Sequence, residues 1–344
     1  MYKAIAIGGS FGAMRVLLKI VSALPEDFPG ALLIVTHIGA RKSSLAEILG
    51  KASRLPVRDA RDGEAVTGGV ILLAPSDYHM LVSEDGGTVR LYHGPKENHT
   101  RPAIDPLFRS VAVAYDEQAI GVILSGYLDD GVAGLQAIKS LGGYVIVQDP
   151  ADAAADSMPS MALGSLAVDM ALLADDIGPE LVKRLTTDRS ESSMSKPSNG
   201  AGVDKESVKS WLKLENRMSA GEGGLAELAR IATPSTFTCP ECHGTLWELS
   251  DSGVRRFRCH TGHAYTARIL EQLQGDVVEE ALWAAVRALQ EREKMLRDLH
   301  AGGAGVERSK KSYAALAETA ANQAALLRAM LERADGDEDT PAAG

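Results

Sequence analysis

The sequence GGSFG at residues 8–12 places Ser10 between glycines, where an apolar run ends and a helical pattern begins near Ala13. A G-x-S-x-G turn between a strand and a helix is typical of a nucleophile elbow, which holds the serine hydroxyl above the edge of a sheet. Backbone amides at the start of the helix can stabilise an oxyanion in the same space. The turn is also compatible with a serine that only caps the helix, or with a loop that cradles a phosphate.

A histidine and a pair of aspartates follow two other predicted strands. His37 comes directly after the apolar run 31–36, and the aspartates 129–130 come shortly after the run 119–125. Because open parallel sheets gather the carboxyl ends of their strands at one edge, we expect Ser10, His37 and one aspartate to converge there. They would act as nucleophile, proton acceptor and orienting carboxylate.

These residues also have alternative interpretations. A histidine after a buried strand can be a hydrogen-bonded core residue. Either aspartate can cap the helix predicted over 131–141, and Asp77 and Asp149 lie near the same edge as rival carboxylates. A dinucleotide site is disfavoured, because the spacing G-x-G-x-x-G is absent and the second strand is followed by His37 instead of an acidic residue.

The elements that must position these side chains follow an α/β pattern. From residue 3 to about 185, short runs rich in Val, Ile and Leu alternate with longer segments of helical period. This alternation predicts a doubly wound, mainly parallel sheet covered by helices. The predicted strands are 3–8, 31–36, 70–74, 79–83, 89–92, 119–125 and 144–148, with a β-hairpin formed by 79–92.

The rest of the chain changes character after residue 185. Its residues 186–203 are rich in Ser and other polar residues, which is typical of a flexible linker. Two long helical patterns near the C-terminus carry apolar stripes that we expect to pack against each other, with self-association as the alternative. The predicted parts are a catalytic domain (1–185), the linker (186–203), a helical connector (204–235), a metal-binding unit (236–265) and a helical hairpin (266–335).

Three cysteines and a histidine form two close pairs in the metal-binding unit. Cys239 and Cys242 are followed, after a strand-forming stretch, by Cys259 and His263. This spacing predicts a structural, zinc-ribbon-like Zn²⁺ site, because zinc prefers thiolate and imidazole ligands and so small a unit needs a cross-link to fold. His260 is the rival fourth ligand, and reduced buried thiols are the alternative to a metal. Four protein ligands leave no open position for a substrate, so we expect the site to be structural. We expect no cofactor for catalysis.

The overall composition indicates which kinds of partner and which cellular compartment to expect. A net charge of −10 argues against nucleic acid, which calls for clustered Lys and Arg. No run approaches the ~18 apolar residues of a membrane helix, and the N-terminus carries no signal-peptide pattern. Clustered free cysteines are typical of a reducing compartment, so we expect a cytoplasmic protein without membrane insertion.

Several segments, in order, resemble the catalytic domain of CheB-type protein-glutamate methylesterases over residues 3 to about 178. The resemblance implies that Ser10 attacks a glutamyl methyl ester on a chemoreceptor or similar signalling protein, that His37 takes its proton, and that Asp130 orients the imidazole. It leaves Asp129 as the helix cap. Some members of the family also deamidate glutamine. The matching segments are GGSFG (8–12), VTH (35–37), LAPSDYHM (73–80), RPAIDPLFRS (101–110), SGYLDDGVAGL (125–135), QDP (148–150) and SMP (157–159).

The sequence departs from the family pattern in three places. Phe11 replaces a small residue or Thr, although the oxyanion would still be bound by backbone amides, for which we expect those of Phe11 and Tyr127. Leu128 stands where Gly is common, and a leucine forced to positive φ would lose about 1 kcal/mol. The first predicted strand begins at residue 3, so we expect no receiver domain. The alternatives are a related binding protein without turnover and a serine esterase for another small ester.

Overall fold

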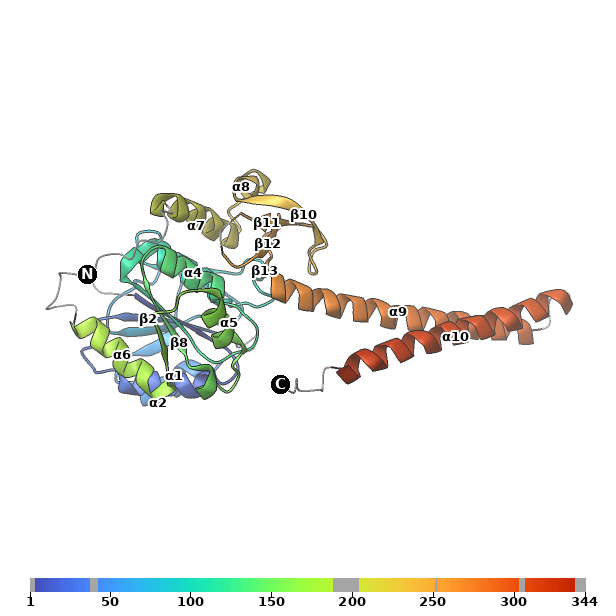
Figure 1. The fold of residues 1–344 in the computed structure, drawn as a ribbon, viewed down its shortest axis with the longest axis horizontal. Helices are drawn as coiled ribbons and strands as arrows, with labels where there is room; N and C mark the ends of the chain where they lie inside the picture. Colours follow the sequence, from blue (N-terminus) through green and yellow to red (C-terminus); the bar gives the residue numbers. More distant parts are fainter. Residues whose placement is uncertain (1–3, 38–42, 188–203, 251–252, 303–306, 338–344) are drawn as a thin grey trace. The chain divides into compact units, whose positions relative to one another are not determined.

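We describe a computed structural model of the chain, which covers residues 4–37, 43–187, 204–250, 253–302 and 307–337 (Figure 1). The chain divides into two compact units, Met1–Leu270 and Glu271–Gly344. The first unit contains the predicted catalytic domain and the cysteine-bearing segment, and the second contains most of the two long C-terminal helices.

A seven-stranded sheet forms the centre of the first unit, and every neighbouring pair of its strands is parallel. The doubly wound parallel sheet predicted from the sequence is therefore confirmed. The prediction does not include the two edge strands, since three residues are too few for a recognisable pattern. In sheet order the strands are β3 (Val57–Asp59), β4 (Val70–Leu73), β2 (Ala31–Thr36), β1 (Ala4–Gly9), β7 (Ala119–Ile123), β8 (Tyr144–Gln148) and β9 (Met170–Leu172).

Helices cover both faces of this sheet. Ile5 and Ile7 of β1 pack toward one face, and Ala4 and Ala6 pack toward the other, because successive side chains of a strand alternate. Both faces are apolar, as expected for a sheet covered on both sides. The first face is covered by α1 (Ala13–Ala23), α2 (Leu45–Ala52) and α6 (Ala174–Thr187), the second by α3 (Ile104–Tyr115), α4 (Val132–Ser140) and α5 (Ser157–Ser165).

The predicted β-hairpin is also present. Strands β5 (His79–Val82) and β6 (Val89–Tyr92) pair antiparallel, and β5 packs against α3. The loop that leaves β6 leads directly into α3, so the hairpin sets the position of that loop beside the carboxyl edge of the sheet.

The C-terminal part of the first unit packs against the α/β part. Its helix α7 contacts α3, and its strands form an antiparallel sheet in the order β10-β11-β12-β13. Helix α6 continues to Thr187, and the rest of the predicted linker lies outside the described residues. The elements are α7 (Lys205–Ser219), α8 (Leu225–Ile231), β10 (Ala232–Thr238), β11 (Thr245–Leu249), β12 (Arg256–Cys259) and β13 (Ala264–Thr266).

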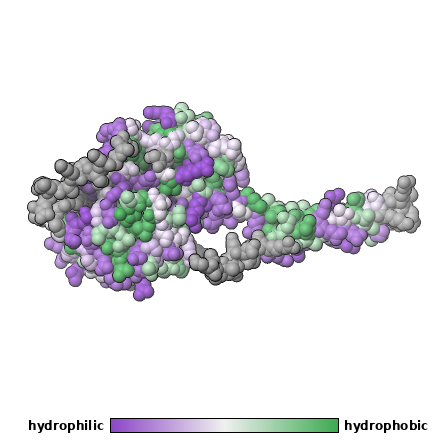
Figure 2. Space-filling model, viewed as in Figure 1, coloured by the Kyte–Doolittle hydropathy of each residue, from purple (hydrophilic) through white to green (hydrophobic). Residues whose placement is uncertain are grey.

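Both long helices of the predicted C-terminal hairpin are present, α9 (Ala267–Ala301) and α10 (Glu307–Asp337) (Figure 1). Small residues of α10, among them Ala317 and Ala320, are buried. Other apolar positions, such as Leu299 and Met330, are exposed, and Figure 2 shows both hydrophobic and hydrophilic residues on the visible face of this hairpin. In the part of the chain that the structure describes, no helix is both long and apolar enough to cross a membrane.

Candidate active site

The serine turn lies between β1 and α1, which begins at Ala13 as predicted. The Ser10 N–H donates to the Ser125 carbonyl oxygen at 2.9 Å and ties the turn to the end of β7. Gly12 has a φ of 82°, which glycine adopts without strain. A Cβ at Gly126 would lie 2.9 Å from the Ser10 Cβ. Glycines on both sides therefore allow the two loops to close around the serine.

The loops that follow three neighbouring strands meet beside this turn, because β1 lies between β2 and β7. His37 follows β2, and its Nε2 lies 2.7 Å from Oδ2 of Asp130 in the loop after β7. Ser10 and His37 line one pocket of about 190 Å³, together with Met14 and Leu45. The structure thus brings the three predicted catalytic residues to one edge of the sheet.

Asp130 is buried and held by several donors. Its Oδ2 also accepts the Ile104 N–H at 2.7 Å, and its Oδ1 accepts Nδ2 of Asn98 at 2.8 Å and the Asp105 N–H at 3.3 Å. Ile104 and Asp105 begin α3, so the positive end of that helix faces the carboxylate. Burial opposes ionisation, but the hydrogen bonds from His37, Ile104 and Asn98 lower the pKa of Asp130. An ionised carboxylate can therefore orient the imidazole.

Asp129 has a different role from the one expected. Helix α4 is preceded by Gly131, which has a φ of 93° and no side chain to cap it, and the Gly134 N–H in its first turn donates to Asp105 at 2.6 Å. The Asp129 carboxylate instead accepts the Thr266 hydroxyl at 2.8 Å, and burial raises its pKa. The expectation that Asp129 caps the helix is wrong, because its side chain is bound by β13.

The rival carboxylates near this edge also have their own partners. Asp77 accepts a hydrogen bond from Arg101 Nε at 2.9 Å, and Asp149 accepts one from the Ala151 N–H at 2.9 Å. Of the aspartates considered from the sequence, Asp130 is the one that the structure places against the imidazole.

The residues expected to bind the oxyanion lie beside Ser10. Phe11 and Tyr127 are more than half exposed, and their ring centroids are 5.5 Å apart. Within the described residues, no hydrogen bond uses the N–H of either residue, so both amides remain available to a substrate oxygen. Leu128 has a φ of 63°, the left-handed conformation in which a leucine was expected to be strained.

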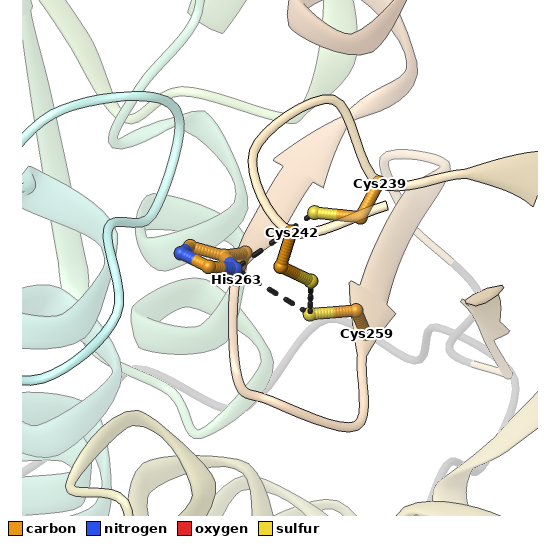
Figure 3. A group of neighbouring side chains, drawn as sticks. All are labelled: Cys239, Cys242, Cys259 and His263. Atoms are coloured by element: carbon orange, nitrogen blue, oxygen red, sulfur yellow. Dashed lines mark hydrogen bonds between the residues drawn. The ribbon is translucent and has the colours of Figure 1, made fainter. Parts of the chain in front are cut away.

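The predicted metal ligands form a cluster in the C-terminal sheet. Figure 3 shows Cys239, Cys242, Cys259 and His263 pointing toward one another, and their ligand atoms lie within 4.8 Å. The sulfur atoms of Cys242 and Cys259 are 3.6 Å apart, and His263 Nδ1 lies 3.6 Å from Cys259 Sγ. His260 is exposed and is not part of this group. Three thiols and one imidazole nitrogen at this spacing fit a structural zinc ion.

Two residues that the sequence analysis missed support the cluster. Nε2 of His263 lies 3.3 Å from Glu241, and the second oxygen of Glu241 lies 3.1 Å from Nδ1 of His99. A metal-binding histidine commonly gives its other ring nitrogen to a carboxylate in this way. Gly262, with a φ of 111°, makes the turn that returns His263 to the thiols. Glu241 lies inside the cysteine motif, but nothing in the local sequence indicates His99.

A buried network of charges joins the two parts of the first unit. Glu97 binds Arg109 at 2.7 Å and Arg258 at 2.8 Å, and Glu215 binds Arg256 at 2.6 Å and Arg258 at 3.1 Å. All five side chains are buried, and despite that burial the arginines lower the pKa of Glu215 to about 2. The network links α7 and β12 to α3, so residues 204–270 are anchored to the α/β part by paired charges.

Comparison with known proteins identifies a family for the α/β part of the chain. Residues 5–181 match the profile of the family described as CheB methylesterase. The chain belongs to the CheB methylesterase family. The family region coincides with the seven-stranded sheet and its helices, and it includes Ser10, His37 and Asp130.

Individual CheB relatives match the same share of the chain. One is a protein-glutamate methylesterase/protein-glutamine glutaminase of Burkholderia orbicola, 40% identical over 53% of each chain. Another is a putative protein-glutamate methylesterase/protein-glutamine glutaminase of Leptospira interrogans, 38% identical over 54% of this chain and 95% of that one. Like the Burkholderia protein, other curated relatives are matched over only about half of their own length.

A solved structure in the family supports the fold. The crystal structure of the Thermotoga maritima CheB methylesterase catalytic domain is 33% identical, with a TM-score of 0.52. The match covers 54% of this chain and 99% of that one. The parallel sheet with helices on both faces is therefore the CheB methylesterase fold.

Proposed function

We propose that this protein hydrolyses methyl esters of glutamyl side chains on a chemoreceptor or similar signalling protein, with Ser10, His37 and Asp130 as its catalytic triad. The observation that carries the proposal is the 2.7 Å contact between His37 Nε2 and Asp130, at the edge where the serine turn lies. Relatives named protein-glutamate methylesterase/protein-glutamine glutaminase indicate the substrate.

The geometry suggests which atoms act in the first chemical step. Because Nε2 of His37 is engaged by Asp130, Nδ1 is the ring nitrogen that remains to accept the proton of Ser10. The serine oxygen then bonds to the ester carbonyl carbon. The amides of Phe11 and Tyr127 stabilise the resulting oxyanion.

The second half of the reaction releases both products. His37 returns its proton to the methoxy oxygen, the carbon–oxygen bond breaks, and methanol leaves an acyl-enzyme on Ser10. Water, deprotonated by His37, attacks that ester, and His37 returns the proton to the Ser10 oxygen as the bond to the glutamyl carboxyl group breaks. The same acyl-enzyme would form from glutamine with ammonia as the leaving group, so deamidation uses the same residues.

The metal cluster has a structural role in this proposal. Cys239, Cys242, Cys259 and His263 would hold one zinc ion, which would cross-link the turns of the β10–β13 sheet. The four ligands would fill a tetrahedral site, so the metal would have no open position for a substrate. We place the protein in the cytoplasm, where thiols stay reduced, and we expect α9 and α10 to serve docking or self-association.

The deciding experiment measures methanol release from a methylated receptor, together with labelling by a fluorophosphonate probe. We expect both in the wild-type protein, and neither in Ser10→Ala. Ser22→Ala, which changes an exposed serine of α1, serves as the control and should behave like the wild type.

The other outcomes identify the alternatives. A folded protein that neither labels nor releases methanol would be a binding protein of this family without turnover. Labelling of Ser10 with turnover of small esters, but without methanol from receptor, would indicate an esterase for another substrate.

A further inference from the structure

The loop that enters α3 pairs with β13 of the C-terminal sheet. The Asn98 N–H donates to the Ala264 carbonyl oxygen at 2.7 Å, and the Ala264 N–H donates to the Lys96 carbonyl oxygen at 3.3 Å. Glu97 and Ala264 form a parallel bridge between these bonds. The loop is therefore held by the strand that directly follows the proposed metal ligand His263.

The side chain of Asn98 connects this strand to the candidate active site. Its Oδ1 accepts the Thr266 N–H at 3.1 Å. Its Nδ2 donates to Oδ1 of Asp130 at 2.8 Å and to Oδ2 of Asp105 at 2.9 Å. Because a primary amide has two N–H bonds, both donors are used by buried carboxylates. Asn98 therefore has one orientation that satisfies all its partners.

The Thr266 side chain contacts the loop after β7, which carries Asp129 and Asp130. Its side chain is fully buried, and its hydroxyl donates to Oδ1 of Asp129 at 2.8 Å. The residue thus binds Asp129 directly and reaches Asp130 through Asn98. Both neighbouring aspartates of the loop after β7 are tied to β13.

We propose that Asn98 and Thr266 are positioning residues, through which the C-terminal sheet fixes the carboxylate that orients His37. The proposal rests on the proposed hydrolase function and extends the catalytic apparatus beyond the family region, which ends at residue 181. Neither side chain lines the pocket of Ser10. Asn98 acts through Asp130, and the Thr266 hydroxyl acts through the adjacent Asp129.

The hydrogen bonds of Asp130 explain why this support matters. Without Asn98, its Oδ1 keeps only the 3.3 Å bond to the Asp105 N–H. A buried carboxylate oxygen that loses its donor is costly, so the side chain would rotate or take up a proton. Since the Asn98 donor lowers the pKa of Asp130, removing it raises that pKa. Either change weakens the hold on His37.

Three variants test the proposal in the full chain. Thr266→Val has the same shape without the hydroxyl, and Thr266→Ser restores the hydroxyl. Asn98→Gly removes the amide and suits the backbone φ of 52°. Thr245→Val is the matched control, because it changes an exposed threonine of the same sheet.

For Asn98→Gly and Thr266→Val we expect kcat on a small ester to fall roughly 10- to 100-fold with little change in KM, the usual size when a supporting partner is lost. The acid limb of the pH profile of kcat should shift in Asn98→Gly, because Asn98 donates both to Asp130 and to Asp105, whose pKa is raised to about 7 by burial and by the Asp130 charge. Thr266→Ser and Thr245→Val should stay near the wild type. Unchanged kcat and pH profile in both Asn98→Gly and Thr266→Val would overturn the proposal.

A second readout does not depend on turnover. The proton between His37 Nε2 and Asp130 should give a low-field ¹H resonance, assigned by its loss in His37→Ala. We expect this resonance to shift or broaden in Asn98→Gly and Thr266→Val. If the wild type proves inactive, the function proposed above fails, but an unchanged resonance in both variants would still separately refute the positioning role. If Asn98→Gly does not fold, the Thr266 pair decides.

Discussion

The candidate active site and the metal cluster are built in opposite ways. The metal ligands lie within one short segment, from Cys239 to His263, and a hairpin and a glycine turn are enough to bring them together. Ser10, His37 and Asp130 come from the ends of three strands, so their meeting depends on the order of strands in the sheet. Local spacing can indicate a metal site, whereas a triad on a parallel sheet needs the whole fold.

The two sites nevertheless share one support. In the loop before α3, His99 contacts Glu241, the partner of His263, while the adjacent Asn98 holds Asp130. The metal cluster and the candidate active site are thus each held by one of two adjacent residues in this loop. Independent assembly of the two sites therefore does not imply that their stabilities are independent.

The largest effect should come from losing the metal. Cys242→Ser should abolish binding of the proposed zinc ion and disorder the β10–β13 sheet, because binding of a structural zinc contributes about 10 kcal/mol or more to folding. Catalysis should fall as well, since β13 holds Asn98 and Asp129. Elemental analysis, hydrogen exchange and kcat measure the three effects.

The exposed His260 provides the control for that experiment. His260→Ala should keep the metal and the activity, because His260 lies outside the cluster. Metal-free Cys242→Ser protein with full activity would show that the two sites are independent after all.

The next largest effect separates the two neighbouring aspartates. Asp130→Asn should lower kcat by about 10⁴-fold, because the wrong imidazole tautomer is then favoured. Asp129→Asn should cost far less, since Asp129 contacts Thr266 and not His37. Steady-state kinetics on a small ester measure both. A large loss of kcat in Asp129→Asn together with a small loss in Asp130→Asn would show that Asp130 is not the catalytic acid.

Breaking the buried charge network should mainly affect stability. Glu215→Gln removes the carboxylate that binds both Arg256 and Arg258, and breaking such a buried pair costs about 3–5 kcal/mol. The exposed pair of Glu222 with Arg90 is the control, for which Glu222→Gln should cost less than about 1 kcal/mol. Urea unfolding compares the variants, and equal losses would show that the network anchors nothing.

The same network predicts acid sensitivity. The pKa of Glu215 is lowered from 4.5 to about 2 in the folded protein, so its contribution to stability is present above pH 4.5 and is lost as the pH falls toward 2. This shift corresponds to about 3 kcal/mol. Unfolding measured over that range should show a steeper loss in the wild type than in Glu215→Gln, whereas parallel curves would contradict the assignment.

The smallest effect concerns backbone strain beside the oxyanion residues. Leu128 adopts a φ of 63°, which costs a residue with a Cβ about 1 kcal/mol or more. Leu128→Gly should therefore be more stable than Leu128→Ala by about 1 kcal/mol, since both lose the same leucine packing. Thermal unfolding of the two variants measures the difference, and a more stable alanine variant would show that the conformation is unstrained.

The sequence by itself determined the features that depend on local pattern. Apolar runs and helical periods predicted the parallel sheet, the β-hairpin and the long C-terminal helices. The strand ends then indicated Ser10 and His37, and the cysteine spacing indicated the metal cluster. Periodicity and spacing are properties of neighbouring residues, so they can be read without knowing the packing.

Only the tertiary structure decided which long-range partners each side chain meets. Local pattern does not distinguish Asp129 from Asp130, and only the family resemblance selects Asp130; in the fold, one binds Thr266 and the other His37. Asn98 and the buried network around Glu215 carried no recognisable pattern, because their partners lie far along the chain. The expected cap at Asp129 failed for the same reason: Thr266 of the distant strand β13 donates to its carboxylate, and Asp105 accepts the Gly134 N–H of the helix that follows it.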